Sequence, residues 1–311
     1  MNTPAWRLLA VDVDGTLIHH GRLDPGDVEA LRRAAAAGIV VCLCTGRTWN
    51  EVRDVWRELE LPGRAGARPG GHAPVVCVGG ALVVEPDTGR TLYARPFDRP
   101  TAADLAEAMR RTGQPVMALV DGWREDFDYY MIGPHEHEGS PSRDVLRLGV
   151  SDPMYRRFFA RRDHRLRPME RLDPGAPGPR PLRISILTGD RPAGDALVER
   201  LRAQFAGRIE AQRIYLAATD AHIVEAFAAG TDKCTALRYV GQGLRIAPAA
   251  MAAIGDDYND LAMLRGVGLA GVPSDAPEAL REVADVIVAP CGQGPVAEFV
   301  GRVCAANGRT A

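Results

Sequence analysis

Two aspartates separated by one residue, Asp12 and Asp14, follow an apolar run in the segment RLLAVDVDGTLIHH, residues 7–20. The run is typical of a buried strand, and residues two apart in an extended segment point to the same side, so both carboxylates should project together. Two carboxylates this close repel each other unless a cation or a shared proton relieves them. Mg²⁺ takes oxygen ligands and often keeps substrate phosphate in its shell, so the pair predicts a Mg²⁺ site. The alternative is a surface turn in which an aspartate caps the next helix.

The basic residues of the chain have an unusual composition. Of the 38 lysines and arginines, Lys233 is the only lysine. Lysine presents a compact point charge, whereas arginine presents a wide planar fork. A single lysine among so many arginines therefore favours a specific role for Lys233, and its chance survival is the alternative.

Polar residues also follow two later apolar runs. Thr45 comes directly after IVVCLC and begins the tripeptide TGR, so we expect its hydroxyl, with Gly46 and Arg47, to lie at a helix N-terminus and bind an anion. The segment GDDYND, residues 255–260, follows MAAI. Asp256 and Asp260 are four residues apart and should share one face once a helix begins. Each of these features alone can be explained as a helix cap. Jointly they bring acids, a hydroxyl and one cation to a single edge of one sheet.

The elements that must position these residues alternate between strand and helix. Strand patterns cover residues 6–13, 39–44 and 75–84, and helix patterns cover 24–38 and 48–61. Asp24, Pro25 and Gly38 are cap, first-turn and stop signals for the first helix. This β-α-β-α-β order predicts a doubly wound parallel sheet, in which ligands bind beyond the carboxyl ends of the strands.

A change of pattern near residue 86 predicts a second domain. Residues 86–228 combine helices with hairpin-like strand pairs, and the alternating pattern returns after about residue 229. We expect residues 1–85 and 229–311 to form the core, with 86–228 inserted as an α/β domain.

Composition narrows the class of protein. The net charge of -2 and the pI of about 6.4 give no field that would recruit nucleic acid or an anionic membrane. No apolar run approaches membrane length, and the early acids disfavour a signal peptide. The six cysteines have neither zinc nor disulfide spacing, so they predict reduced thiols and a cytoplasmic location.

The polar residues above resemble the four motifs of the haloacid dehalogenase-like (HAD) phosphatases. The motifs occur in order as DVDGT at 12–16, Thr45, Lys233 and GDDYND at 255–260. An insert between Thr45 and Lys233 is similar to that of the Cof-type, class IIB sugar-phosphatase branch. The resemblance implies a Rossmann-like HAD core with a type-two cap, acting on a small-molecule phosphate ester as a monomer or homodimer.

The resemblance also implies roles for individual residues. Asp12 would be the nucleophile that forms an aspartyl-phosphate, and Asp14 the acid and base. Mg²⁺ would be held by the Asp12 side chain, the Asp14 backbone carbonyl and Asp256. Thr45 and Lys233 would hold phosphoryl oxygens. Asn259 and Asp260 would complete the metal's shell through water or orient Lys233. Gly46, Arg47 and Asn259 could bind phosphate or substrate, and the alternative for Arg47 is a surface arginine at a helix start. Asp257 is expected to be a helix-start residue that points away.

Two regions leave substrate contacts open. The family often has Asn-Gly-Ala after the third strand, where this chain has Gly79 and Gly80, so a substrate contact made by the amide is in doubt. The cap segment 121–139 is the richest candidate for selecting the leaving group. Its aromatic residues could bind sugar hydroxyls or could pack the cap sheet; they are Trp123, Tyr129 and Tyr130. His135 and His137 are spaced like ligands on an extended segment, and the alternative is an ordinary polar loop.

Three other functions compete with a Mg²⁺-dependent phosphomonoester hydrolase. A phosphosugar mutase can share the first motif, but it needs a second phosphate cradle, for which the arginines at 156–167 are the only candidates. A dehalogenase would give Asp14 no role, because no alkoxide leaves. A non-catalytic metabolite-binding protein would predict loss of some of the acidic residues, and all of them are present.

Overall fold

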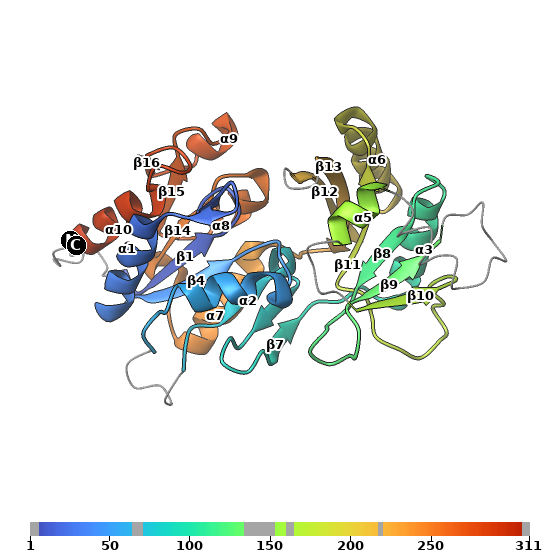
Figure 1. Ribbon diagram of the computed structural model, residues 1–311, viewed down its shortest axis with the longest axis horizontal. Helices are drawn as coiled ribbons and strands as arrows, with labels where there is room; N and C mark the ends of the chain where they lie inside the picture. The colour runs from blue at the N-terminus through green and yellow to red at the C-terminus, as the bar shows by residue number, and fades with distance from the viewer. Residues whose placement is uncertain (1–5, 64–70, 134–152, 160–164, 217–219, 307–311) are drawn as a thin grey trace. The chain divides into compact units, whose positions relative to one another are not determined.

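The computed structural model describes residues 6–63, 71–133, 153–159, 165–216 and 220–306 (Figure 1). The chain forms two compact units: Met1–Tyr93 with Asp232–Ala311, and Ala94–Thr231. Within the described residues, no helix combines the length and the apolarity needed to cross a membrane.

The first unit is built on an eight-stranded sheet. Five adjacent strand pairs around the centre of the sheet are parallel, and β5 pairs antiparallel with β6. The strand order across the sheet is β16 (Val286–Val288), β15 (Leu269–Pro273), β14 (Met251–Ile254), β1 (Leu8–Asp12), β4 (Val40–Cys44), β5 (Val75–Cys77), β6 (Leu82–Val84) and β7 (Thr91–Ala94). The strands β1, β4 and β14 are buried on both faces, which explains their nearly continuous apolar sequences.

Helices cover both faces of this sheet, as expected for a doubly wound fold. Leu8 and Ala10 of β1 pack in one cluster with residues of α7 (Lys233–Leu244), α8 (Leu261–Arg265) and α9 (Glu278–Arg281). The opposite face carries α10 (Pro295–Ala306), whose Phe299 lies against Gly271 of β15. The carboxylate of Asp27 in α1 (Pro25–Ala36) accepts a hydrogen bond from the backbone of Ala297 and joins α1 to α10. The α/β fold predicted from the sequence is therefore confirmed.

In the first half of the core, the structure confirms a predicted helix start but not one predicted strand. Helix α1 begins at Pro25 with Asp24 as its cap, as predicted. Helix α2 (Trp49–Glu58) is capped by Thr48, whose hydroxyl and backbone both bond Glu51. The strand predicted over residues 75–84 is wrong in its middle, because the 3₁₀ turn η1 (Val78–Gly80) interrupts it. All three residues of η1 have positive φ, which no strand can contain.

Short elements complete the first unit. They are the hairpin β2 (Ile18–His19) and β3 (Arg22–Leu23), and the 3₁₀ turns η3 (Pro248–Ala250) and η4 (Tyr258–Asp260).

The second unit is a six-stranded mixed sheet with helices. Its order is β10 (Leu166–Met169), β9 (Tyr129–Ile132), β8 (Val116–Leu119), β11 (Arg183–Thr188), β13 (Ala221–Ala228) and β12 (Ile209–Leu216). Helices α3 (Arg99–Arg110) and α6 (Arg191–Gln204) pack on one face, and α5 (Pro153–Phe159) is the third helix among the described residues. The predicted hairpin-like pairings are present, because β12 and β13 pair antiparallel along their whole length.

Candidate active site

Three strand ends bring the first predicted residues together. β1 ends at Asp12, which is in register with Cys44 at the end of β4, and Val11 is in register with Ile254 at the end of β14. Because these strands are parallel, the residues that follow them leave the sheet at one edge. That edge therefore carries the first motif, the Thr45 loop and the GDDYND segment.

Lys233 links two of these motifs through its ammonium group. It is the first residue of α7, its side chain is completely buried, and Nζ donates to Oδ1 of Asp12 at 2.5 Å and to Oδ1 of Asp260 at 2.7 Å. Burial alone would lower the pKa of Lys233, but the two carboxylates more than offset it and raise that pKa above its ordinary value. The lysine is thus held as a cation between two acids.

A third acid makes the cluster suitable for a metal ion. Asp12, Asp256 and Asp260 each offer a carboxylate oxygen within 4.8 Å of the others. Burial, and then the charge of Asp260, raise the pKa of Asp12 well above its usual range, and the same two causes raise the pKa of Asp256 to about 6. Oδ2 of Asp12 is buried without a hydrogen-bond partner among the residues the structure describes. Three carboxylates with one ammonium leave excess negative charge, and a hard divalent cation fits this donor set.

Asp260 already uses both of its oxygens. Oδ1 accepts from Lys233, and Oδ2 accepts from the backbone N–H groups of Asp256 and Asp257, each at 3.3 Å. The predicted shared helix face of Asp256 and Asp260 is wrong, because η4 begins at Tyr258 and α8 only at Leu261. A turn closed by the Asp260 side chain holds the two acids together instead. Asp257 caps that turn by accepting from the backbone of Tyr258, as expected for a helix-start residue.

Two neighbours of Asp256 come from the first motif and were not predicted. The Thr16 hydroxyl donates to Oδ1 of Asp256 at 2.8 Å. Gly15 has φ +91, and a Cβ atom placed there would lie 2.1 Å from Oδ2 of Asp256. Thr16 is 240 residues from Asp256 in the chain, so only the fold could reveal this contact.

Asp14 has a cationic partner of its own. Its carboxylate accepts from the guanidinium of Arg47 through two bonds, at 2.5 and 2.8 Å, and its side chain is 56% exposed. Mg²⁺ was expected to relieve the repulsion in the aspartate pair, whereas Arg47 is the residue that faces Asp14. The carboxylate of Asp14 is not one of the three in the acid cluster, and a role for its backbone carbonyl stays a prediction.

Thr45, Gly46 and Arg47 form a loop and not the predicted helix start. Helix α2 begins four residues later at Trp49, and the buried Thr45 hydroxyl accepts from the backbone N–H of Arg47 at 3.1 Å. Asn259 stands near Asp260 in η4, and its Oδ1 is buried without a partner among the described residues. The structure therefore groups Asp12, Lys233, Asp256 and Asp260 directly and adds the Asp14–Arg47 pair.

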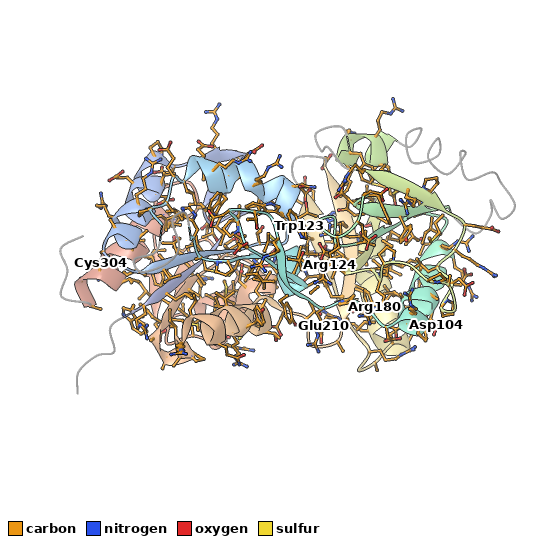
Figure 2. All side chains as sticks on the ribbon, turned by 90° about the horizontal axis from the view of Figure 1, so that it is seen from below. Asp104, Trp123, Arg124, Arg180, Glu210 and Cys304 are labelled. Atoms are coloured by element: carbon orange, nitrogen blue, oxygen red, sulfur yellow. The ribbon has the colours of Figure 1, made fainter. Side chains whose placement is uncertain are left out.

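The aromatic residues predicted in the second unit divide into two kinds. Tyr129 and Tyr130 are buried in β9, where Tyr129 accepts from Arg183 and Tyr130 packs against Phe127, so both pack that unit's sheet. Trp123, which Figure 2 labels, has a side chain on the surface and is 55% exposed by its accessible area. His135 and His137 lie outside the described residues.

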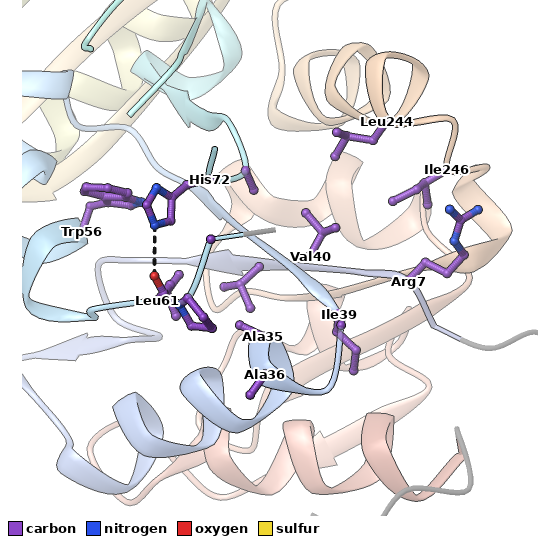
Figure 3. A pocket seen from close by; sticks show the side chains of 15 residues that line it. Arg7, Ala35, Ala36, Ile39, Val40, Trp56, Leu61, His72, Leu244 and Ile246 are labelled. Atoms are coloured by element: carbon purple, nitrogen blue, oxygen red, sulfur yellow. Dashed lines mark hydrogen bonds between the residues drawn. The ribbon is translucent and has the colours of Figure 1, made fainter. Parts of the chain in front are cut away.

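A cavity of about 340 Å³ lies far from the acid cluster, at the amino ends of the core strands (Figure 3). Arg7, Val40 and Ile246 line it together with His72, whose ring bonds Asp87 and the carbonyl of Leu61. None of the predicted site residues lines this cavity, so it plays no part in the chemistry considered below.

The fold and the acid cluster define a class of α/β hydrolases with an inserted mixed-sheet domain. The family model of haloacid dehalogenase-like hydrolases matches residues 9–300, so the chain belongs to that family and is a HAD-like phosphatase.

Individual relatives are distant, but each of the following three covers at least 90% of the chain. Phosphatase YwpJ of Bacillus subtilis is 23% identical over 90% of this chain and 94% of that protein. The 5-amino-6-(5-phospho-D-ribitylamino)uracil phosphatase YwtE of the same organism is 21% identical over 96% of this chain and 98% of its own. Among solved structures, a subclass IIB sugar phosphatase superposes with a TM-score of 0.65 at 17% identity, covering 95% of this chain and 98% of that one. This structural likeness concerns the fold alone.

Proposed function

We propose that the protein hydrolyses a small phosphorylated metabolite, a sugar phosphate, with Mg²⁺ and through an aspartyl-phosphate on Asp12. The observation that supports this best is the different environment of the two carboxylate oxygens of Asp12. Oδ1 is held by Lys233 at 2.5 Å, and Oδ2 is buried without a partner among the described residues. A carboxylate fixed by one oxygen with the other available suits nucleophilic attack on phosphorus.

The first step transfers the phosphoryl group to the protein. The Asp12 carboxylate attacks phosphorus, the bond from phosphorus to the ester oxygen breaks, and Asp14 gives a proton to the departing alkoxide. The exposed position of Asp14 suits a group that must meet a leaving alcohol, and its two bonds to Arg47 hold the carboxylate in place. Lys233 and Thr45 would hold phosphoryl oxygens while charge develops on them.

The second step releases orthophosphate. Asp14, now ionised, takes a proton from water as that water attacks phosphorus, and the bond from phosphorus to the Asp12 oxygen breaks. Asp12 returns to its carboxylate form. One residue thus serves as acid and then as base, and no other co-reactant is needed.

The proposed Mg²⁺ would be held by Asp12, Asp256 and the backbone carbonyl of Asp14, and it would neutralise charge on the transferring phosphoryl group. Both Asp260 oxygens are occupied, so orienting Lys233 is the role that its contacts favour. Arg47 would position Asp14. Asn259 would bind the substrate through its side-chain oxygen, and Gly46 would contribute only its backbone to the loop.

A sugar phosphate is proposed as the substrate on two grounds. The relatives compared above include a sugar phosphatase and a phosphatase of a phosphorylated ribityl compound. The inserted unit, 94–231, would select the leaving group, and its exposed Trp123 could stack on a sugar ring.

Turnover of p-nitrophenyl phosphate with and without Mg²⁺ tests the mechanism, with wild type and Asp12→Asn compared. We expect Mg²⁺-dependent release of phosphate and a loss of at least about 10³-fold in Asp12→Asn. Turnover that needs no metal, or an Asp12→Asn variant as active as wild type, would refute the proposal. A panel of sugar and other metabolite phosphates then tests the substrate class.

A further inference from the structure

The turn η1 begins with a backbone conformation that its first residue, Val78, does not favour. Val78, Gly79 and Gly80 have φ values of +54, +63 and +101. The left-handed region suits glycine, but it is a genuine outlier for a β-branched residue such as Val78, which is also buried. Strain of this kind persists only where surrounding contacts enforce it, and it concentrates at functional sites.

One set of enforcing contacts comes from the Thr45 loop. The backbone N–H of Val78 donates to the carbonyl of Arg47 at 2.9 Å, and that of Gly79 donates to the carbonyl of Thr45 at 3.0 Å. Just before the turn, the carbonyl of Val76 accepts from the N–H of Thr45 at 2.9 Å. Three backbone bonds therefore fix the Thr45 loop to β5 and η1.

The other side of the turn touches the start of α7. A Cβ atom on Gly80 would lie 2.1 Å from the carbonyl oxygen of Asp232 and 2.9 Å from the backbone nitrogen of Lys233. Only glycine allows the turn to approach this peptide so closely. The contact is with backbone atoms, so no side chain can move aside to make room.

We infer that η1 is a positioning element that sets the spacing between the Thr45 loop and Lys233. These are the two groups assigned to hold phosphoryl oxygens, so the inference rests on the function proposed above. Val78 and Gly79 fix one arm by hydrogen bonds, and Gly80 fixes the other by close contact. A shift of about 1 Å between such groups can cost a hundredfold in rate.

Gly80→Ala tests this inference, and Gly113→Ala is its matched control. Gly113 also has a positive φ, +79, but a Cβ atom there would meet nothing within 4 Å. We expect Gly80→Ala to lower kcat/KM for p-nitrophenyl phosphate about 100-fold and to raise the Kd for orthophosphate, measured by calorimetry with Mg²⁺, at least about 10-fold. The control should change each value less than about twofold. Should Gly80→Ala not fold, Gly79→Ala should weaken orthophosphate binding by a smaller factor of about 3 to 10.

A double-mutant cycle separates positioning from simple loss of stability. Thr45→Val removes one phosphate-holding hydroxyl, so the effects of Gly80→Ala and Thr45→Val on the Kd for orthophosphate should combine less than additively. Additive effects, or a foldable Gly80 or Gly79 variant that binds orthophosphate as wild type does, would overturn the inference. A wild type that binds orthophosphate with this coupling but turns over no ester would instead refute the proposed hydrolase and leave the positioning role intact.

Discussion

The ammonium nitrogen of Lys233 lies 2.5 Å from Oδ1 of Asp12, and both side chains are buried. The same nitrogen contacts Asp260 at 2.7 Å, so the lysine is enclosed by acids. An arginine at this position would need room for a planar guanidinium that the packed site does not have.

Lys233→Arg should therefore lower kcat/KM by about 100-fold or more, although it keeps the positive charge. Lys233→Met provides the comparison, since it keeps the length and removes the charge. Because it leaves two buried carboxylates without their cation, we expect it to cost about 3–5 kcal/mol of stability. Phosphatase assays and thermal unfolding of both variants check this. Near-normal activity in Lys233→Arg would show that any cation suffices.

Arg47 should matter most for substrates whose leaving group needs a proton. Its guanidinium orients the Asp14 carboxylate through two bonds, and Lys cannot reproduce that fork. p-Nitrophenolate leaves without protonation, whereas a sugar alkoxide does not. We therefore expect Arg47→Lys to reduce kcat/KM for an alkyl phosphate about tenfold more than for p-nitrophenyl phosphate.

Arg57→Lys is the matched control for Arg47→Lys. Arg57 is more exposed and pairs with Asp54 at 3.4 Å, away from the predicted site. This variant should leave both rates unchanged. Equal losses on the two substrates in Arg47→Lys would indicate that Arg47 binds the phosphoryl group and does not act through Asp14.

Much of the architecture followed from local signals. The apolar strand runs, the Asp24–Pro25 helix start and the motif order were sufficient for the sheet, for α1 and for the family. Parallel strands bring their carboxyl ends to one edge, so the meeting of Asp12 with Asp256 was also predictable.

Pairings between distant residues were not predictable. Sequence patterns indicate that Asp14 and Arg47 share an edge, but they cannot show which acid each cation faces. The break in the strand at Val78 was hidden because valine favours strands, and contacts from the Thr45 loop override that preference. The Thr45 loop and the GDDYND turn were read as helix starts because capping residues occur in loops and turns as well.

Gly15→Ala should damage metal binding beyond what its loss of stability explains. Its Cβ atom would meet the end of the short Asp256 side chain at 2.1 Å, and that side chain can turn away. The φ of +91 adds a cost of about 1–2 kcal/mol for alanine. We expect the Mg²⁺ concentration for half-maximal activity to rise at least about tenfold.

Gly21→Ala controls for the backbone cost alone. Gly21 has φ +76, and a Cβ atom there would meet nothing within 4 Å. It should lose similar stability and keep its Mg²⁺ response. If the two variants respond to Mg²⁺ alike, Asp256 is not a metal ligand.

The Mg²⁺ affinity should fall as the pH drops through about 6. Burial raises the pKa of Asp256 to about 6, so below that pH a proton occupies the carboxylate and competes with the cation; above it the ionised ligand is available. The hydroxyl of Thr16 donates to Asp256 and lowers the pKa of Asp256.

Thr16→Val should therefore raise the pKa of Asp256 and move the loss of Mg²⁺ affinity to higher pH. Thr88→Val removes a similar bond, to Glu85, away from the acid cluster and should move nothing. Mg²⁺-induced shifts in Tm between pH 5 and 8 measure this, and a Thr16→Val profile identical to wild type would refute it.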